Sequence, residues 1–106
     1  MVEYKIYTTE EFDKDFKKLD NSIQLQIEAE LEQVQNNPFV GKPLGYPWFR
    51  ELRNDKWRVY YLVYDRLVVV LFVGVSDKKS QQVVINVIKS NLKVLKEFVE
   101  KRTKIL

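Results

Sequence analysis

The feature that most constrains the fold of this chain is the apolar segment LVVVLFVGVS at residues 67–76. Its β-branched and aromatic residues favour a strand. Successive side chains of a strand point to opposite faces of a sheet, and in this segment both sets are apolar. Both faces of the strand are therefore predicted to be covered by other elements. The segment is far shorter than the roughly 20 residues that a membrane-spanning helix requires.

Two further strand patterns come directly before this segment. The sequences WFRELR (48–53) and WRVYYLVY (57–64) are separated by residues 54–56, which suit a hairpin turn. Residues 65–66 form a second short connection. Three strands joined so closely are predicted to form an antiparallel meander. The Pro- and Gly-rich segment at 38–47 is predicted to be a loop.

The first third of the chain predicts a short strand followed by two helices. Residues 2–7 alternate apolar and polar side chains, as a half-buried strand does. Thr8, with Glu11 three residues later, fits a capping box. After a break at 20–22, a second helical pattern runs to Asn36 and ends before a proline. We expect the two helices to pack as an antiparallel hairpin on one face of the sheet.

The segment from Ser80 onward is the candidate cover for the other face. It carries an apolar stripe at helical spacing, formed by Val84, Ile88, Leu92, Leu95 and Val99. A continuous helix as far as Lys104 would be about 37 Å long at roughly 1.5 Å per residue. A domain of this size needs a shorter helix than this to cover its sheet. We therefore expect the end of the helix to project, to move or to meet a partner. The whole chain, residues 1–106, is thus predicted to be one α+β domain.

Composition narrows the functions open to this domain. The chain contains no histidine and no cysteine, which removes the commonest acid–base residue, the commonest metal ligand and any disulfide. We expect no cofactor and no metal. The N-terminal residues lack the apolar segment of a signal peptide, and a cytoplasmic protein without a membrane partner is expected.

Charge is distributed unevenly between the two parts of the chain. Residues 1–37 hold nine acids and four bases, giving −5, whereas residues 38–106 hold six acids and fourteen bases, giving +8. A basic second part favours a polyanionic partner. Random clustering on a soluble surface is the alternative interpretation.

The alternation of strand side chains predicts a charged group on one sheet face. With Leu52 facing the helical hairpin, the opposite face collects Glu51, Arg53, Arg58 and Tyr60. Further cations are expected at the rim of this face: Arg50, Lys56, Lys78 and Lys79.

This group suits the cleavage of RNA by attack of a 2′-hydroxyl. Arginine binds phosphate oxygens in bidentate fashion, and Arg58 beside Arg53 is repelled unless an anion lies between them. Glu51 can act as the base, although an arginine neighbour would lower its pKa. The alternative is a surface ion pair of Glu51 with one of the arginines, worth under about 1 kcal/mol. Tyr60 or Trp48 can stack on a base; tyrosines in such strands also serve simply to pack the sheet.

The segments NNPFVGKPL, RELRNDKWRVYYLV and VGVSDKK, taken in order, resemble the RelE/ParE toxin superfamily, and most closely its archaeal RelE-like members. The resemblance covers nearly the whole chain. It implies a toxin of a type II toxin–antitoxin pair, and many such toxins bind in the ribosomal A site and cut messenger RNA without a metal. By position, Arg58 corresponds to the arginine that contacts the scissile phosphate, Lys78 to a cation after the last strand, and Arg53 to a basic residue of the preceding strand. Arg50, Lys56, Tyr60 and Lys79 are the expected RNA contacts beside these.

The chain also departs from the pattern of the family. RelE toxins carry lysines where this chain has Phe49 and Glu51, and a tyrosine where it has Val84. The resemblance therefore assigns neither the general base nor the general acid. Two alternatives stay open: a ParE-like toxin that poisons DNA gyrase without cutting RNA, and a degenerate toxin that retains antitoxin binding alone.

The expected partners follow from the same resemblance. They are a cognate antitoxin, the ribosome and messenger RNA. An antitoxin helix would compete for the surface that the stripe from Val84 to Val99 covers; a permanently packed tail helix is the alternative. Whether the protein forms a dimer or a heterotetramer with the antitoxin is left open.

Overall fold

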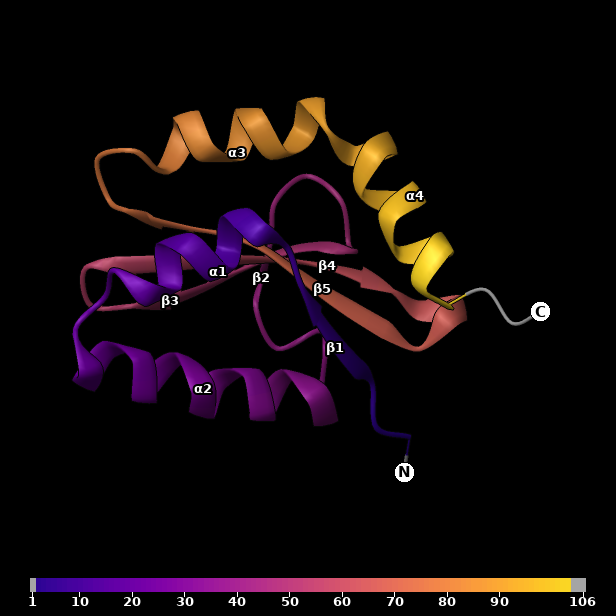
Figure 1. Cartoon of the computed structure of the whole chain (residues 1–106), viewed down its shortest axis with the longest axis horizontal. Helices are drawn as coiled ribbons and strands as arrows, with labels where there is room; N and C mark the ends of the chain where they lie inside the picture. Colours follow the sequence, from indigo (N-terminus) through magenta and orange to yellow (C-terminus); the bar gives the residue numbers. More distant parts are fainter. Residues whose placement is uncertain (1, 104–106) are drawn as a thin grey trace.

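The computed structural model describes residues 2–103 and is an α+β fold around one five-stranded sheet (Figure 1). The strands are β1 (Lys5–Thr8), β2 (Lys42–Pro43), β3 (Phe49–Asn54), β4 (Trp57–Tyr64) and β5 (Val69–Asp77). Their order is β1-β5-β4-β3-β2, in which β1 runs parallel to β5 and the other neighbours are antiparallel. The predicted meander is therefore confirmed as β3, β4 and β5.

Helices cover both faces of this sheet. The helices α1 (Glu10–Lys17) and α2 (Asn21–Asn36) pack on one face, and α3 (Gln81–Ser90) and α4 (Leu92–Thr103) pack on the other. Figure 1 shows α2 and α3 on opposite sides of the strands. The short helix η1 (Asp65–Leu67) joins β4 to β5. Among residues 2–103, no helix is both long and apolar enough to cross a lipid bilayer.

Each face of the sheet has its own apolar core. Val59, Tyr61 and Val63 of β4 pack with α1 and α2, whereas Tyr60 and Leu62 pack with α3 and α4. This is the alternation that the sequence predicted for β4. It explains why the strand β5 is apolar on both faces, since all but the last of its residues are buried between the two layers.

Three local expectations are corrected by the structure. Thr9, not Thr8, caps α1, because Thr8 is the last residue of β1 and the Thr9 hydroxyl accepts the N–H of Phe12 at 3.1 Å. The loop at 38–47 contains the two-residue strand β2. The tail is not one continuous helix but two, α3 and α4. Lys104, where the predicted helix ended, lies outside the described residues.

The break in the tail has a physical cause at residues 90 and 91. The Ser90 hydroxyl donates to the carbonyl of Asn86, and the Asn91 side chain donates to the carbonyl of Val87, both at 2.7 Å. Such side chains compete with the helical hydrogen bonds of the backbone. The break lets α4 return toward the sheet, where Val99 is fully buried. The prediction that the tail projects is therefore wrong as far as Thr103.

Candidate nucleic-acid interface

The two arginines singled out by the sequence lie directly opposite each other. In the register of β3 and β4, Arg53 pairs with Arg58, and Glu51 pairs with Tyr60. Residues opposite each other in neighbouring strands share a face of the sheet. The structure thus brings together the predicted group of two arginines, one carboxylate and one tyrosine.

Arg58 is a buried cation without a carboxylate partner. Its side chain and backbone are together only 7% exposed. One terminal nitrogen donates to the backbone carbonyls of Trp57 at 3.0 Å, Asp55 at 3.3 Å and Asn54 at 3.5 Å, while its buried Nε has no acceptor. Within residues 2–103, no carboxylate oxygen comes within 4.0 Å of the Arg58 guanidinium. Because a buried charge is costly unless it is paired, this site favours an anion.

Glu51 forms a buried link between β3 and α3. It is 1% exposed, and its two carboxylate oxygens accept from Arg53 Nε at 2.7 Å and from the side-chain amide of Gln81 at 2.6 Å. Glu51 therefore forms an ion pair, as the alternative interpretation had it, and its partner is Arg53. The expectation of an ordinary surface pair is wrong, because the carboxylate is enclosed while the Arg53 side chain stays 49% exposed.

Tyr60 lies too deep to stack on a base. It is fully buried beneath α3, and its hydroxyl shares a hydrogen bond of 2.7 Å with Ser76. Burial raises the pKa of this hydroxyl above its ordinary value, and the bond to Ser76 only partly offsets that effect. The prediction that Tyr60 contacts RNA is contradicted, and the packing interpretation is confirmed.

Arg50 is also occupied within the protein. Its guanidinium donates to the carbonyls of Gly41 at 2.8 Å, Pro47 at 2.7 Å and Phe39 at 2.9 Å. The side chain thereby holds the loop between α2 and β3 in place. The RNA contact of Arg50 stays a prediction, because three of its five N–H groups hold this loop and the side chain is only partly buried.

The remaining predicted cations gather at one end of the sheet. Lys56 lies exposed in the β3–β4 turn, and Lys78 and Lys79 lie exposed in the turn from β5 to α3. The two turns are neighbours because Trp57 pairs with Asp77 in the sheet, and they lie at the left of Figure 1. We call this region the basic end, formed by Arg53, Lys56, Arg58, Lys78 and Lys79.

The turn that carries the two lysines is fixed by its own hydrogen bonds. The Asp77 carboxylate accepts from the Ser80 hydroxyl at 2.6 Å and from the Ser80 N–H at 2.8 Å. The hydroxyl bond, followed by the backbone bond, lowers the pKa of Asp77. The carboxylate is therefore ionised and holds the turn throughout the neutral range.

Two residues of this region were not foreseen from the sequence. Gln81 completes the link to Glu51, and Ser76 is the partner of the Tyr60 hydroxyl. Neither belongs to a motif. Their roles arise from the close approach of α3 to the sheet, where a Cβ atom at Gly74 would lie 3.5 Å from Val84 and 3.6 Å from Ile88.

The apolar stripe predicted to meet an antitoxin is packed on the protein's own sheet. Ile88 and Val99 are buried there, and Val84, Leu92 and Leu95 are partly buried in the same core. In the structure, therefore, the tail helices are packed on the sheet of the same chain. A partner can reach the buried side chains of Ile88 and Val99 only by displacing α3 and α4.

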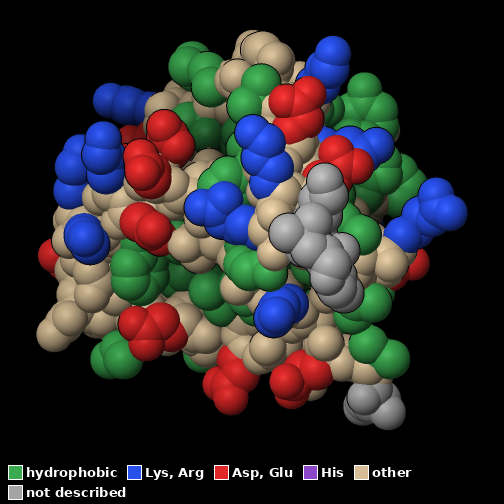
Figure 2. Space-filling model, turned by 45° about the vertical axis from the view of Figure 1, so that its right-hand side comes forward, with side chains coloured by type: hydrophobic (Ala, Val, Ile, Leu, Met, Phe, Trp, Pro, Cys, Tyr) green, Lys and Arg blue, Asp and Glu red, His purple; other side chains and the backbone are tan. Residues whose placement is uncertain are grey.

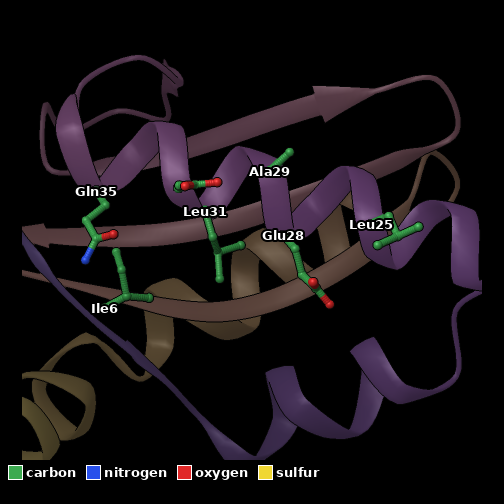
Figure 3. A pocket seen from close by; sticks show the side chains of 7 residues that line it. Ile6, Leu25, Glu28, Ala29, Leu31 and Gln35 are labelled. Carbon is green, nitrogen blue, oxygen red and sulfur yellow. The ribbon is translucent and has the colours of Figure 1, made fainter.

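Other surfaces of the molecule suit a polyanion less well. An open groove of about 540 Å³ runs along α2 beside β1, where Leu31 and Gln35 point toward Ile6 (Figure 3). Glu28 and Glu32 also line this groove, and their charge opposes phosphate binding. At the α4 end, basic and acidic side chains are interspersed (Figure 2). No cluster of three or more acidic residues in the described part of the chain could hold a metal ion.

Comparison with known proteins identifies the fold. The sequence profile of the family described as "ParE toxin of type II toxin-antitoxin system, parDE" matches residues 6–79. The intact E. coli RelBE toxin–antitoxin complex contains a chain with 28% identity and a TM-score of 0.63, over 70% of this protein and 95% of that chain. A mutant of the E. coli toxin RelE in the free state has 26% identity and a TM-score of 0.70, over 83% of this protein and 97% of that chain.

A more distant relative shares the fold alone. The RelB–RelE antitoxin–toxin complex from Methanococcus jannaschii has 22% identity and a TM-score of 0.59, over 72% of this protein and 94% of that chain. No curated protein sequence gives a significant match. Because the family profile covers well over half of the sequence, this chain belongs to the RelE/ParE toxin superfamily and is a toxin of a RelBE/ParE-type toxin–antitoxin system.

Proposed function

We propose that this toxin inhibits translation by cutting messenger RNA on the ribosome in a metal-independent reaction. The 2′-oxygen bonds to the neighbouring phosphorus as the 2′-hydroxyl loses its proton, the bond from phosphorus to the 5′-oxygen breaks, and the leaving 5′-oxygen takes up a proton. One observation carries the proposal: Arg58 is buried directly opposite Arg53, and no carboxylate of residues 2–103 pairs with Arg58. A phosphate bound between the two guanidinium groups would supply the missing negative charge. It would also relieve the repulsion between two neighbouring cations.

In this proposal the protein contributes charge stabilisation and positioning. Negative charge builds up on the phosphorus oxygens as the 2′-oxygen attacks, and prearranged guanidinium donors stabilise that charge. Two of the three carbonyl contacts of Arg58 are 3.3 Å or longer, so they are weak and a phosphate oxygen can replace them. Lys78, exposed at the rim of the basic end, stabilises the same charge from a greater distance.

Glu51 is given a positioning role rather than the role of a general base. Its carboxylate is enclosed, and both oxygens accept hydrogen bonds from the protein, so a 2′-hydroxyl cannot approach it without displacing these partners. The ion pair instead orients Arg53, whose exposed side faces solvent. The ribosome can supply the remaining alignment of the RNA, which makes a small set of protein groups sufficient.

A second candidate function is poisoning of DNA gyrase by binding, without cleavage. The observation that favours it is that Phe49 and Glu51 stand where RelE toxins carry lysines, and both are buried in the layer beneath α3. This leaves the site with fewer exposed cations than a dedicated nuclease would use.

Primer extension distinguishes the two functions. The purified toxin is incubated with ribosomes programmed with a messenger RNA, and the RNA ends are mapped; in parallel, plasmid supercoiling by gyrase is followed with and without the toxin. We expect new ends at codon-defined positions that require ribosomes, and unchanged supercoiling. Loss of supercoiling without RNA ends would establish the gyrase function, and neither effect would indicate a toxin retained for antitoxin binding alone.

We further propose that a cognate antitoxin acts on α3 and α4. An antitoxin segment with an apolar face would compete for the surface that Ile88 and Val99 now cover. Amide hydrogen exchange of α3 and α4, measured with and without the antitoxin, tests this. Faster exchange in the complex supports displacement, whereas slower exchange would mean that the antitoxin binds over the packed helices.

A further inference from the structure

We propose that the loop between β2 and β3 carries a stacking platform for a base of single-stranded RNA, formed by Tyr46 and Trp48. This inference rests on the proposed function, because it gives the same RNA a second contact. The rings of Tyr46 and Trp48 lie parallel, with centroids 4.5 Å apart and an angle of 16° between their planes. Tyr46 is 43% exposed and Trp48 is 37% exposed. Large aromatic side chains left this open mark binding surfaces more often than cores.

The platform is built on a rigid loop. Arg50 ties Pro47 of this loop to Gly41 and Phe39 of the segment before β2, and its guanidinium also lies 5.4 Å from the ring centroid of Phe39. The buried Tyr61 hydroxyl donates to the carbonyl of Pro38 at 2.7 Å and accepts from the N–H of Gly41 at 3.0 Å. A loop that served only as a connection would not need so many internal bonds. Rigid aromatic groups bind with little loss of conformational entropy.

Glycine is required at the point where this loop crosses the sheet edge. A Cβ atom at Gly41 would lie 2.8 Å from both the Glu51 carbonyl oxygen and the Tyr61 hydroxyl. Gly45 adopts a φ of +92°, which favours glycine. The chain thus approaches β3 closely and then turns back, which presents Tyr46 and Trp48 outward.

The charge around the platform suits a nucleic acid. Lys42 lies exposed on β2, and the Lys89 ammonium lies 3.7 Å from the position of a Cβ atom on Gly45. The sequence from residue 37 to residue 49 contains no acid. Aromatic side chains beside cations are the usual means by which proteins hold single-stranded nucleic acid, because every base has a face on which an aromatic ring can stack.

The platform lies away from the proposed cleavage centre. Trp48 comes directly before β3, and Arg53 lies five positions later in that strand, which is about 17 Å at roughly 3.3 Å per residue. The two sites would therefore contact different nucleotides of one strand. The platform would hold a base at a distance from the scissile phosphate and set the register of the RNA on the toxin.

Tryptophan fluorescence tests this assignment. The chain has two tryptophans, so the variant Trp57→Phe leaves Trp48 as the reporter. We expect oligouridylate and oligoadenylate to quench its emission to saturation, with weaker binding at higher salt. With labelled oligonucleotides, Trp48→Leu and Tyr46→Leu should each lower the affinity about five- to 150-fold, and Trp48→Phe should retain most of it.

Leu25→Ala is the matched control, because Leu25 is an exposed apolar residue on α2, outside the platform; it should bind RNA like the wild type. Unquenched emission, or wild-type affinity in folded Trp48→Leu and Tyr46→Leu, would overturn the assignment even if the toxin cuts RNA. Quenching that persists in a toxin without any cleavage would instead support the platform while removing the proposed nuclease function.

Discussion

At the scale of single residues, the charged group on β3 and β4 divides into two arginines with opposite environments. Arg53 is paired with Glu51 and half exposed, whereas Arg58 is enclosed and, in the described part of the chain, has only backbone carbonyls as partners. The sequence could predict that these side chains share a face, because strand alternation fixes it. It could not predict which arginine takes the carboxylate, because that depends on where α3 places Gln81.

The first prediction separates the positioning role of Glu51 from a catalytic one. Glu51→Gln keeps the shape of the side chain and removes the charge that Arg53 and Gln81 share. We expect the free energy of unfolding to fall by about 1–3 kcal/mol, while ribosome-dependent cleavage continues at a rate within about tenfold of the wild type. Chemical denaturation and primer extension measure the two effects. Glu28→Gln, on the exposed side of α2, is the control; abolished cleavage in folded Glu51→Gln would restore Glu51 as the base.

The second prediction concerns Arg50. A lysine cannot reproduce the planar fork with which Arg50 bonds three carbonyls. Arg50→Lys is therefore expected to lower the free energy of unfolding by about 1–3 kcal/mol, although the charge is kept. Limited proteolysis should show faster cleavage between residues 38 and 48. Lys42→Arg is the matched control with no expected change, and equal stability of Arg50→Lys and wild type would contradict the structural role.

At the scale of elements, the helices of the tail could be predicted from the sequence, but the break between them could not. The apolar stripe correctly predicted helices that cover the second face of the sheet, because β5 needed such a cover. The break after Ser90 was missed, since the periodicity of the stripe continues across it. What ends α3 is a pair of side-chain hydrogen bonds to the preceding turn, which a pattern of apolar residues does not reveal.

A third prediction tests how tightly α3 is docked. Ile88 is buried against the sheet, whereas its neighbour Val87 is 55% exposed on the same helix. Ile88→Ala should lower the free energy of unfolding by about 2–5 kcal/mol, and Val87→Ala should change it by at most about 0.5 kcal/mol. Denaturant titrations of both variants provide the measurement. Similar small effects for the two variants would mean that α3 lies loosely on the sheet.

At the scale of the whole molecule, the sheet between two helical layers could be predicted because β5 is apolar on both faces. The family came from the resemblance of three sequence segments, NNPFVGKPL, RELRNDKWRVYYLV and VGVSDKK, and the family profile confirms it. The site was predicted less well. Tyr60 and Arg50 were expected to meet RNA, but Tyr60 is buried beneath α3, and Arg50 uses three of its N–H groups to hold the loop before β3. Whether such a side chain packs inside the protein or faces a ligand depends on neighbours that are distant in the sequence, so the sequence alone does not reveal it.

Buried tyrosines of the sheet predict a loss of stability at high pH. Burial raises the pKa of Tyr64 to about 12, and Glu100 adds to this effect. In the unfolded chain tyrosine ionises near pH 10, so between about pH 10 and 12 the folded protein binds more protons and its stability falls as the pH rises. Tyr64→Phe should reduce this fall, measured as the pH dependence of the free energy of unfolding. An unchanged pH profile in Tyr64→Phe would contradict the assignment.

The central claim is that Arg58, which no carboxylate between residues 2 and 103 neutralises, binds a phosphodiester. The rate of ribosome-dependent messenger RNA cleavage by Arg58→Ala, compared with the wild type, tests it most directly. We expect the rate to fall at least about 100-fold. The variant also loses the hydrogen bonds of Arg58 to three carbonyls, so its free energy of unfolding should fall by about 1–3 kcal/mol, and circular dichroism must show that it is folded. Cleavage at nearly the wild-type rate by the folded variant would contradict the account.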